Sequence, residues 1–251
     1  MTTCGVLTLG ALTAPGAQAV GGPTITKVVV NGGKNIVVGP TTATNFTATV
    51  TASDRSGVIE TGLELWYGGS KSEAKGWIAR AGDLKCKASS STTTTCTIRF
   101  QVMANRRALV NEVTNSFAGT WHVSPSAFSR NRVQTVDDSF TTVKVQRASQ
   151  LTVNAAPEPV KKGKTVTVTG KLSRANWDTR QYVGYSGQPV KLQFRAKSSA
   201  TYTTVKTVTT SSTGTLKTTV AASADGYYRY SFAGTSTTPA ANAAGDFIDV
   251  Q

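Results

Sequence analysis

Apolar and polar side chains alternate along most of this chain, a pattern that predicts β-strands. In residues 44–52, Phe46, Ala48 and Val50 lie on one side of the extended chain and mainly threonine occupies the other. A period of two is typical of a strand with one buried and one exposed face. The same alternation returns in residues 225–233, which open with the Asp-Gly pair of a tight turn. Both segments are therefore predicted to be half-buried strands.

Residues 225–233 have the pattern of a late strand in an immunoglobulin-like sandwich, where a tyrosine near the start of the strand anchors the preceding loop. Tyr227 and Tyr228 are the candidates for that role, and residues 119–123 have a similar pattern earlier in the chain. We expect an all-β protein of two tandem immunoglobulin-like β-sandwiches after an N-terminal signal segment. Residues 20–148 are predicted to form the first sandwich and residues 149–251 the second.

The alternation is lost in two places. Residues 71–91 lack it apart from the short run around Trp77, and they are predicted to form the largest loop of the first sandwich. In residues 104–115, Ala108, Leu109 and Glu112 have helical spacing. A short helix is predicted there.

The first nineteen residues differ from the rest of the chain. Residues 6–14 are apolar or neutral, and residues 17–19 read Ala-Gln-Ala, the small-x-small pattern after which signal peptidase cuts. A signal peptide over residues 1–19 and a secreted protein are expected, the alternative being a poorly structured tail. No Lys or Arg precedes the apolar run, so we expect Met1 to lie within a longer signal. The run is too short to span a bilayer, and no membrane span is expected.

Three cysteines occur in the chain, and cleavage of the signal would remove Cys4. The remaining pair, Cys86 and Cys96, is predicted to form a disulfide in an oxidising compartment. We expect this bond to pinch a mobile polar loop, residues 87–95, and closing a ring of about 11 residues is worth about 2.8 kcal/mol. A redox or zinc pair is the alternative, but the spacing fits neither motif.

The net charge is +14, and each half of the chain after residue 19 carries +7. For a secreted protein this charge predicts attraction to an anionic cell-wall polymer or polysaccharide, the alternative being a solvated surface with no dedicated partner. The basic block 161–164 has no interleaved aromatic residues. A specific nucleic-acid partner is therefore not expected.

The segments 157–164, 187–195 and 225–235 together resemble secreted two-domain immunoglobulin-like proteins of actinobacteria. The resemblance covers both predicted domains and is more specific in the second. Most such proteins are uncharacterised, and the resemblance implies no catalytic residues. Some carry the name calcium-binding protein, which implies a calcium site. Asp137 and Asp138 are the densest acidic pair of the first half, and with Asp54 and backbone carbonyls they are the candidate ligands, the alternative being solvated turn acids.

Aromatic residues gather in one predicted loop of the second sandwich, residues 176–188. Such side chains can stack on sugar rings while basic and amide groups supply hydrogen bonds. The alternative is that the tryptophan closes the core beneath the sheet edge. The candidate polysaccharide-binding residues are Trp177, Tyr182, Tyr185, Arg174, Arg180 and Asn176.

Catalytic patterns are weak in this sequence. The chain has one histidine, His122, placed on a predicted strand opposite the apolar face, and the acids are scattered singly. Nucleophilic catalysis needs a base beside a nucleophile, and glycoside hydrolysis needs two facing carboxylates. We expect no enzyme, but a secreted binding or structural module that acts outside the cell or at the wall. The second hypothesis is a calcium-binding structural or adhesive protein.

Overall fold

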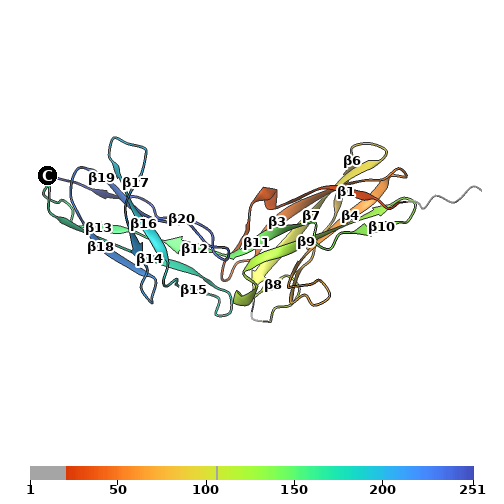
Figure 1. Cartoon of the computed structure of the whole chain (residues 1–251), viewed down its shortest axis with the longest axis horizontal. Helices are drawn as coiled ribbons and strands as arrows, with labels where there is room; N and C mark the ends of the chain where they lie inside the picture. The colour runs from red at the N-terminus through yellow and green to blue at the C-terminus, as the bar shows by residue number, and fades with distance from the viewer. Residues whose placement is uncertain (1–20, 106) are drawn as a thin grey trace, which may run out of the picture.

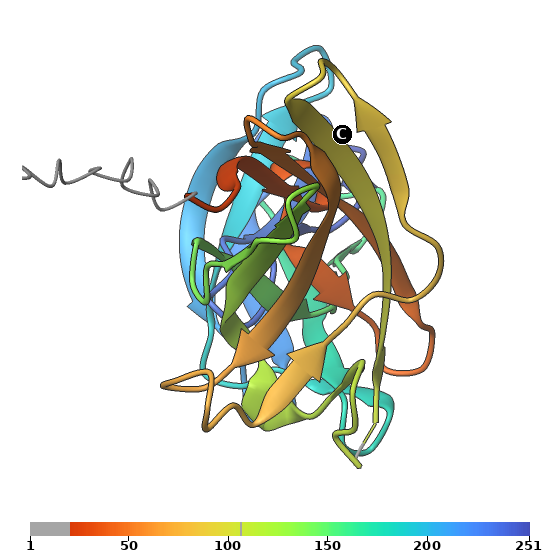
Figure 2. The same cartoon turned by 90° about the vertical axis from the view of Figure 1, so that its right-hand side faces the viewer.

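The computed structural model describes residues 21–105 and 107–251, which form two β-sandwiches placed end to end (Figure 1). The predicted signal segment 1–19, with Cys4, lies outside the described residues. Figure 2 looks along the long axis with the first sandwich toward the viewer. Helix is limited in the described chain to the 3-10 turns η1 (Asn31–Gly33) and η2 (Asn115–Phe117). No helix in the described chain is long and apolar enough to cross a membrane.

The first sandwich consists of two sheets with the strand order of an immunoglobulin domain. Its strands are β1 (Thr24–Val30), β2 (Ile36–Val38), β3 (Thr44–Ser53), β4 (Val58–Tyr67), β5 (Gly76–Ile78), β6 (Lys85–Ala88), β7 (Thr93–Ala104), β8 (Glu112–Val113), β9 (Gly119–Ser129), β10 (Gln134–Val136) and β11 (Thr141–Arg147). One sheet has the order β1-β3-β7-β6 and the other β2-β11-β9-β4-β5. Because β2 continues from β1 but joins the opposite sheet, parallel to β11, the chain begins as many immunoglobulin domains do.

The second sandwich follows after a single residue, Ala148. Its strands are β12 (Ser149–Leu151), β13 (Asn154–Ala156), β14 (Thr165–Asn176), β15 (Gln181–Gly184), β16 (Pro189–Ala196), β17 (Thr203–Thr209), β18 (Thr215–Ala221), β19 (Gly226–Phe232), β20 (Ala241–Asn242) and β21 (Asp246–Ile248). One sheet has the order β12-β14-β13, with β15 and β18 also on β14, and the other β17-β16-β19-β20, with β21 also on β19. The predicted fold class, two tandem immunoglobulin-like sandwiches, is confirmed by this topology.

A tyrosine does tie the second sandwich together, but it is neither of the two predicted. Tyr230 is fully buried, and its hydroxyl donates to the carbonyl of Val168 on β14, in the opposite sheet, at 3.0 Å. Tyr227 points to the outer face, and Tyr228 is buried in the core. This bond joins the two sheets and does not hold the loop before β19, so it differs from the predicted anchor, although alternation places Tyr228 and Tyr230 on the same inner face.

Two local predictions were wrong. Residues 71–91 contain β5 and β6 in place of one open loop, and Trp77 on β5 pairs with Trp66 on β4. In the described part of 104–114 there is no helix, because Ala108 and Asn111 have positive φ values of 52° and 66°. Such values interrupt a right-handed helix.

Candidate functional site

The predicted aromatic loop forms the joint between the two sandwiches. Trp177 follows the end of β14 and is 0% exposed, packed among apolar side chains of the first sandwich. Its indole nitrogen donates to the carbonyl of Val38 at 3.0 Å, and its backbone N–H donates to Asn115 Oδ1 at 2.9 Å. The indole is thus part of the core of the domain that precedes it. The alternative in which Trp177 closes a core is therefore confirmed, although the core is that of the first sandwich, and stacking on a sugar is wrong because no face of the ring reaches solvent.

Polar groups around Trp177 fix the same joint. Asn115 Nδ2 donates to Asn176 Oδ1 at 2.8 Å and to Asp178 Oδ2 at 2.6 Å. The Asn115 backbone N–H also donates to Asp178 Oδ1, at 3.1 Å. Asn176 Oδ1 accepts from the backbone N–H of Asp178 and Thr179 at 3.1 Å each. Asn176 therefore orders the β14–β15 turn and is engaged within the protein.

Arg147, at the end of β11, spans the joint from the other side. It is 7% exposed, and its Nε donates to the carbonyl of Ala175 at 2.6 Å. Its backbone N–H donates to the carbonyl of Thr237 at 2.9 Å. Burial, and then the charge of Arg174, lower the pKa of Arg147 to about 10. A buried cation is costly unless it is hydrogen-bonded, so this residue depends on the second sandwich for its partners.

The other members of the predicted sugar-binding set do not assemble into an open platform. The Arg174 guanidinium lies 3.8 Å over the ring of Tyr185, which also packs edge-on to Phe232. Tyr182 is 38% exposed and Arg180 is exposed. The structure brings Arg174 and Tyr185 together but as partners of each other, which leaves one open aromatic side chain, Tyr182, among the predicted set.

The predicted calcium ligands are not brought together. Asp54 lies in the turn before β4 and accepts hydrogen bonds from Ser56. The carbonyl of Asp138 accepts from the indole of Trp66, near the far end of β4. About 25 Å of strand separates the two ends. Asp137 accepts the backbone N–H of Ser139. The three-residue site is therefore wrong, and within the described residues no group of three or more His, Cys, Asp or Glu could hold a metal ion.

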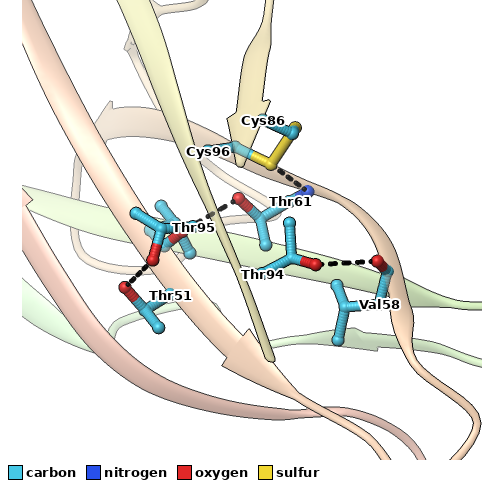
Figure 3. The surroundings of a disulfide bond; sticks show 8 residues. Thr51, Val58, Thr61, Cys86, Thr94, Thr95 and Cys96 are labelled. Atoms are coloured by element: carbon cyan, nitrogen blue, oxygen red, sulfur yellow. Dashed lines mark hydrogen bonds between the residues drawn. A yellow bond between two sulfur atoms is a disulfide. The ribbon is translucent and has the colours of Figure 1, made fainter. Parts of the chain in front are cut away.

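The predicted disulfide is present between Cys86 and Cys96. It joins directly opposed residues of β6 and β7, so it links two strands and does not pinch an open loop. Cys96 is buried, and its Sγ accepts the backbone N–H of Thr61 at 3.3 Å (Figure 3). Nearby, Thr94 Oγ1 donates to the carbonyl of Val58 at 2.9 Å. The bond thus fastens the edge strand β6 to the core of the first sandwich.

His122 is placed as predicted, on the outer face of the first sandwich. Its ring stacks on Trp66 with centroids 4.0 Å apart, and its Nδ1 lies 2.7 Å from Ser139 Oγ. Beside it, Lys71 Nζ lies 2.7 Å from Glu64 and 2.8 Å from Asp138. Burial opposes the charge of Lys71, but the hydrogen bonds to the two acids outweigh burial and raise its pKa. Through Glu64 and Asp138, and through Ser124 Oγ at 2.8 Å, Lys71 ties the loop after β4 to β4 itself, to the turn between β10 and β11, and to β9.

A cation–aromatic stack on the outer face of the second sandwich was missed by the sequence reasoning. β16 supplies Arg195, β19 supplies Tyr227 and Arg229, and β21 supplies Phe247. The register places Arg195 opposite Tyr227 and Tyr227 opposite Phe247. We call this set the cation–aromatic ladder. In spatial order its members are Arg229, Tyr202, Arg195, Tyr227, Phe247 and Lys197.

The distances within the ladder are those of direct stacking. The Arg229 guanidinium lies 3.8 Å from the ring centroid of Tyr202, and the Arg195 guanidinium lies 3.9 Å from that of Tyr227 and 5.4 Å from that of Tyr202. Cations within about 6 Å of a ring centroid are attracted to its face. The outward alternation in 191–197 and 227–231 was a signal for this site, but only strand pairing shows that the two rows are neighbours.

Comparison with known proteins gives little beyond these observations. Residues 36–127, less than half of the chain, match a family of unknown function (DUF5707). No curated protein matches the chain. Dimeric latent PorU from Porphyromonas gingivalis is 14% identical over 92% of this chain, which spans only 20% of that protein, with a TM-score of 0.28. The D00-D0 domain of intimin is 14% identical over 88% of this chain and 99% of its own, with a TM-score of 0.27.

A putative membrane anchored protein from Corynebacterium diphtheriae is 14% identical over 91% of this chain and 53% of its own, with a TM-score of 0.31. At these scores the likenesses carry no inference. The fold assignment stands on the strand order and pairing described above.

Proposed function

We propose that this protein is a secreted, non-enzymatic module that acts outside the cell or at the cell wall, where it binds an anionic wall polymer or polysaccharide. The observation that carries the proposal is the packed joint at Trp177, through which two sandwiches share a core and present their outer faces along one elongated body. An elongated body of two sandwiches exposes the outer faces of its sheets, and these faces are suited to binding a polymer.

Two further features support the proposal. The Cys86–Cys96 disulfide fits an oxidising, extracellular compartment. The net charge of +14, shared evenly by the two halves, attracts anionic polymers over a range set by the ionic strength. The loop that the sequence predicted to bind sugar, residues 176–188, helps to form the joint between the two sandwiches. The face that binds the polymer therefore has to lie elsewhere.

Fractionation of the cells that naturally produce this protein, with whatever signal sequence they make, tests export. The expected result is a processed protein in the medium or wall fraction, with Cys86 and Cys96 bonded. Retention of the unprocessed chain inside the cell with both thiols free would overturn the proposal. In a second step, the exported protein is sedimented with purified wall polymer, and the bound fraction is expected to fall as salt rises.

The calcium hypothesis is tested separately by melting the same protein in millimolar calcium and in chelator. A ligand bound only by the native state must raise the melting temperature. Equal melting temperatures in calcium and in chelator would therefore overturn the calcium hypothesis.

A further inference from the structure

We propose that the cation–aromatic ladder is a binding site for a linear acidic polysaccharide, a chain of sugars that carries carboxylate groups. This inference rests on the proposed function and names the face and the ligand chemistry that the function would use. The ladder lies on the outer face of the sheet formed by β16, β19 and β21, opposite the core side chains Leu192, Tyr228 and Tyr230.

The guanidinium groups of the ladder are oriented before any ligand arrives. Arg229 Nε donates to Gln193 Oε1 at 2.8 Å, and one terminal nitrogen of Arg195 donates to the carbonyl of Ser199 at 3.0 Å. Each guanidinium is also stacked on a tyrosine ring. Of the five N–H groups of each arginine, the described chain uses one, and the others remain for a ligand. Because the forks are already held, less side-chain entropy is lost on binding.

The charge of the ladder is incompletely neutralised by the protein. In the described chain no salt bridge joins Arg195 or Arg229 to an acid, whereas Lys197 lies 3.9 Å from Asp225 in an exposed pair. Asp246, on β21, points away from the ladder and accepts the backbone N–H of Ala155 in the other sheet. A planar guanidinium binds a carboxylate through two parallel hydrogen bonds, so the two arginines are suited to carboxylates spaced along a chain.

The ring faces distinguish an acidic sugar from a single-stranded nucleic acid. Proteins bind such strands by letting the bases stack on open faces of their aromatic side chains. Here the ring of Tyr202 has Arg229 at 3.8 Å and Arg195 at 5.4 Å, and the ring of Tyr227 has Arg195 at 3.9 Å and Phe247 at 5.2 Å. The faces are thus engaged within the ladder. The edges of the guanidinium groups, the Gln193 amide and the half-exposed tyrosines remain available to a ligand. These groups form hydrogen bonds with the carboxylates and hydroxyls of a sugar chain.

Close packing at two glycines keeps the ladder in place. A Cβ at Gly245 would lie 2.3 Å from the hydroxyl of Tyr202, and a Cβ at Gly226 would lie 2.3 Å from the carbonyl of Arg195. At Gly226 the short contact is with backbone, so the close approach of β16 to β19 requires glycine there. At Gly245 it is with the end of the Tyr202 side chain, so a larger residue would displace the Tyr202 hydroxyl from its place in the ladder.

The test uses the full chain and three soluble probes measured by calorimetry at low salt: polygalacturonate, neutral dextran and single-stranded oligo-dT. Polygalacturonate is expected to bind, dextran not to bind, and oligo-dT to bind at least tenfold more weakly than polygalacturonate. The double variant Arg195→Gln with Arg229→Gln is expected to weaken polygalacturonate binding at least tenfold. Arg195→Lys with Arg229→Lys keeps the charge but removes the planar forks, and is expected to recover only part of the affinity.

A matched control removes the same charge from the opposite sheet of the same sandwich. Lys171 and Lys217 are exposed on β14 and β18, and Lys171→Gln with Lys217→Gln is expected to change affinity less than threefold. Three results would each overturn the proposal: an equal loss of polygalacturonate affinity in the control and in the ladder variant, no loss of affinity in the ladder variant, or binding of oligo-dT that is tighter than binding of polygalacturonate. Unchanged melting temperatures exclude misfolding as the cause. If the ladder variants do not weaken binding while export and binding to wall polymer are normal, the proposed function stands and its binding site lies elsewhere on the protein.

Discussion

The indole nitrogen of Trp177 donates to the carbonyl oxygen of Val38, 3.0 Å away, and so joins the two sandwiches through a residue that belongs by sequence to the second and by packing to the first. The same carbonyl accepts the backbone N–H of Ala148 at 2.9 Å. Both lone pairs of the Val38 carbonyl oxygen are therefore used, one by the linker residue Ala148 and one by the second sandwich. We expect the two sandwiches to unfold as one cooperative unit for this reason.

Replacing Trp177 tests this coupling. Trp177→Ala removes a buried indole from a shared core and is expected to lower the free energy of unfolding by about 3–5 kcal/mol. It should also split one calorimetric transition into two. Trp177→Phe keeps most of the packing but loses the hydrogen bond, and is expected to cost about 1–2 kcal/mol. Tyr182→Ala, in the same hairpin but 38% exposed, is the control and should cost less than about 1 kcal/mol. Two separate transitions in the unmodified protein would contradict the coupling.

The polar side of the joint is tested by Asn115→Asp. The amide of Asn115 donates to Asn176 Oδ1 and to Asp178 Oδ2, and a carboxylate would place an acceptor against both oxygens and a like charge against Asp178. We expect a loss of about 3 kcal/mol at neutral pH. The loss should shrink below pH 4, where a protonated carboxyl can donate again.

Urea denaturation at pH 7 and at pH 3.5 measures this difference. Asn45→Asp, at an exposed position of β3, is the control and should change little at either pH. A loss in Asn115→Asp that is the same at both pH values would argue against a direct contact with Asp178.

The disulfide is expected to act on the first sandwich. Because it closes a ring of about 11 residues, Cys86→Ala with Cys96→Ala should lower the free energy of unfolding by about 2.8 kcal/mol. A reducing agent should lower the stability of the unmodified protein by a similar amount and leave the variant unchanged. Equal sensitivity of both proteins to the reductant would show that it acts elsewhere.

Sequence reasoning reached the fold because alternation is a local property. Phe46, Val50, Tyr228 and Tyr230 reveal their inner faces within a few residues of their own strands. For Trp177 it left a buried ring and a sugar-stacking ring as alternatives, because the core that the ring enters contains Val38, which lies far away in sequence and in another sandwich. The ladder was missed for the same physical reason, since Arg195 and Tyr227 become neighbours only through strand pairing.

The last prediction concerns the stability of the protein at alkaline pH, to which Tyr230 contributes. Its hydroxyl donates to the Val168 carbonyl inside the core, and burial raises its pKa to about 12 from an ordinary value of 10. The unfolded chain loses this proton near pH 10 while the folded chain keeps it until about pH 12, so the stability contributed by the neutral form is present below pH 10 and lost as pH rises from 10 to 12. Two pKa units correspond to about 2.7 kcal/mol.

Tyr230→Phe removes that titration. It is expected to cost about 1 kcal/mol at pH 8, where the hydrogen bond to Val168 is lost, and to show a shallower fall in stability between pH 10 and 12 than the unmodified protein. Burial also raises the pKa of Tyr228, so part of the fall remains in the variant. Urea denaturation at intervals from pH 8 to pH 12 measures both profiles, with Tyr182→Phe as the exposed control. Parallel profiles for Tyr230→Phe and the unmodified protein would mean that the Tyr230 hydroxyl is not held in its neutral form by the fold.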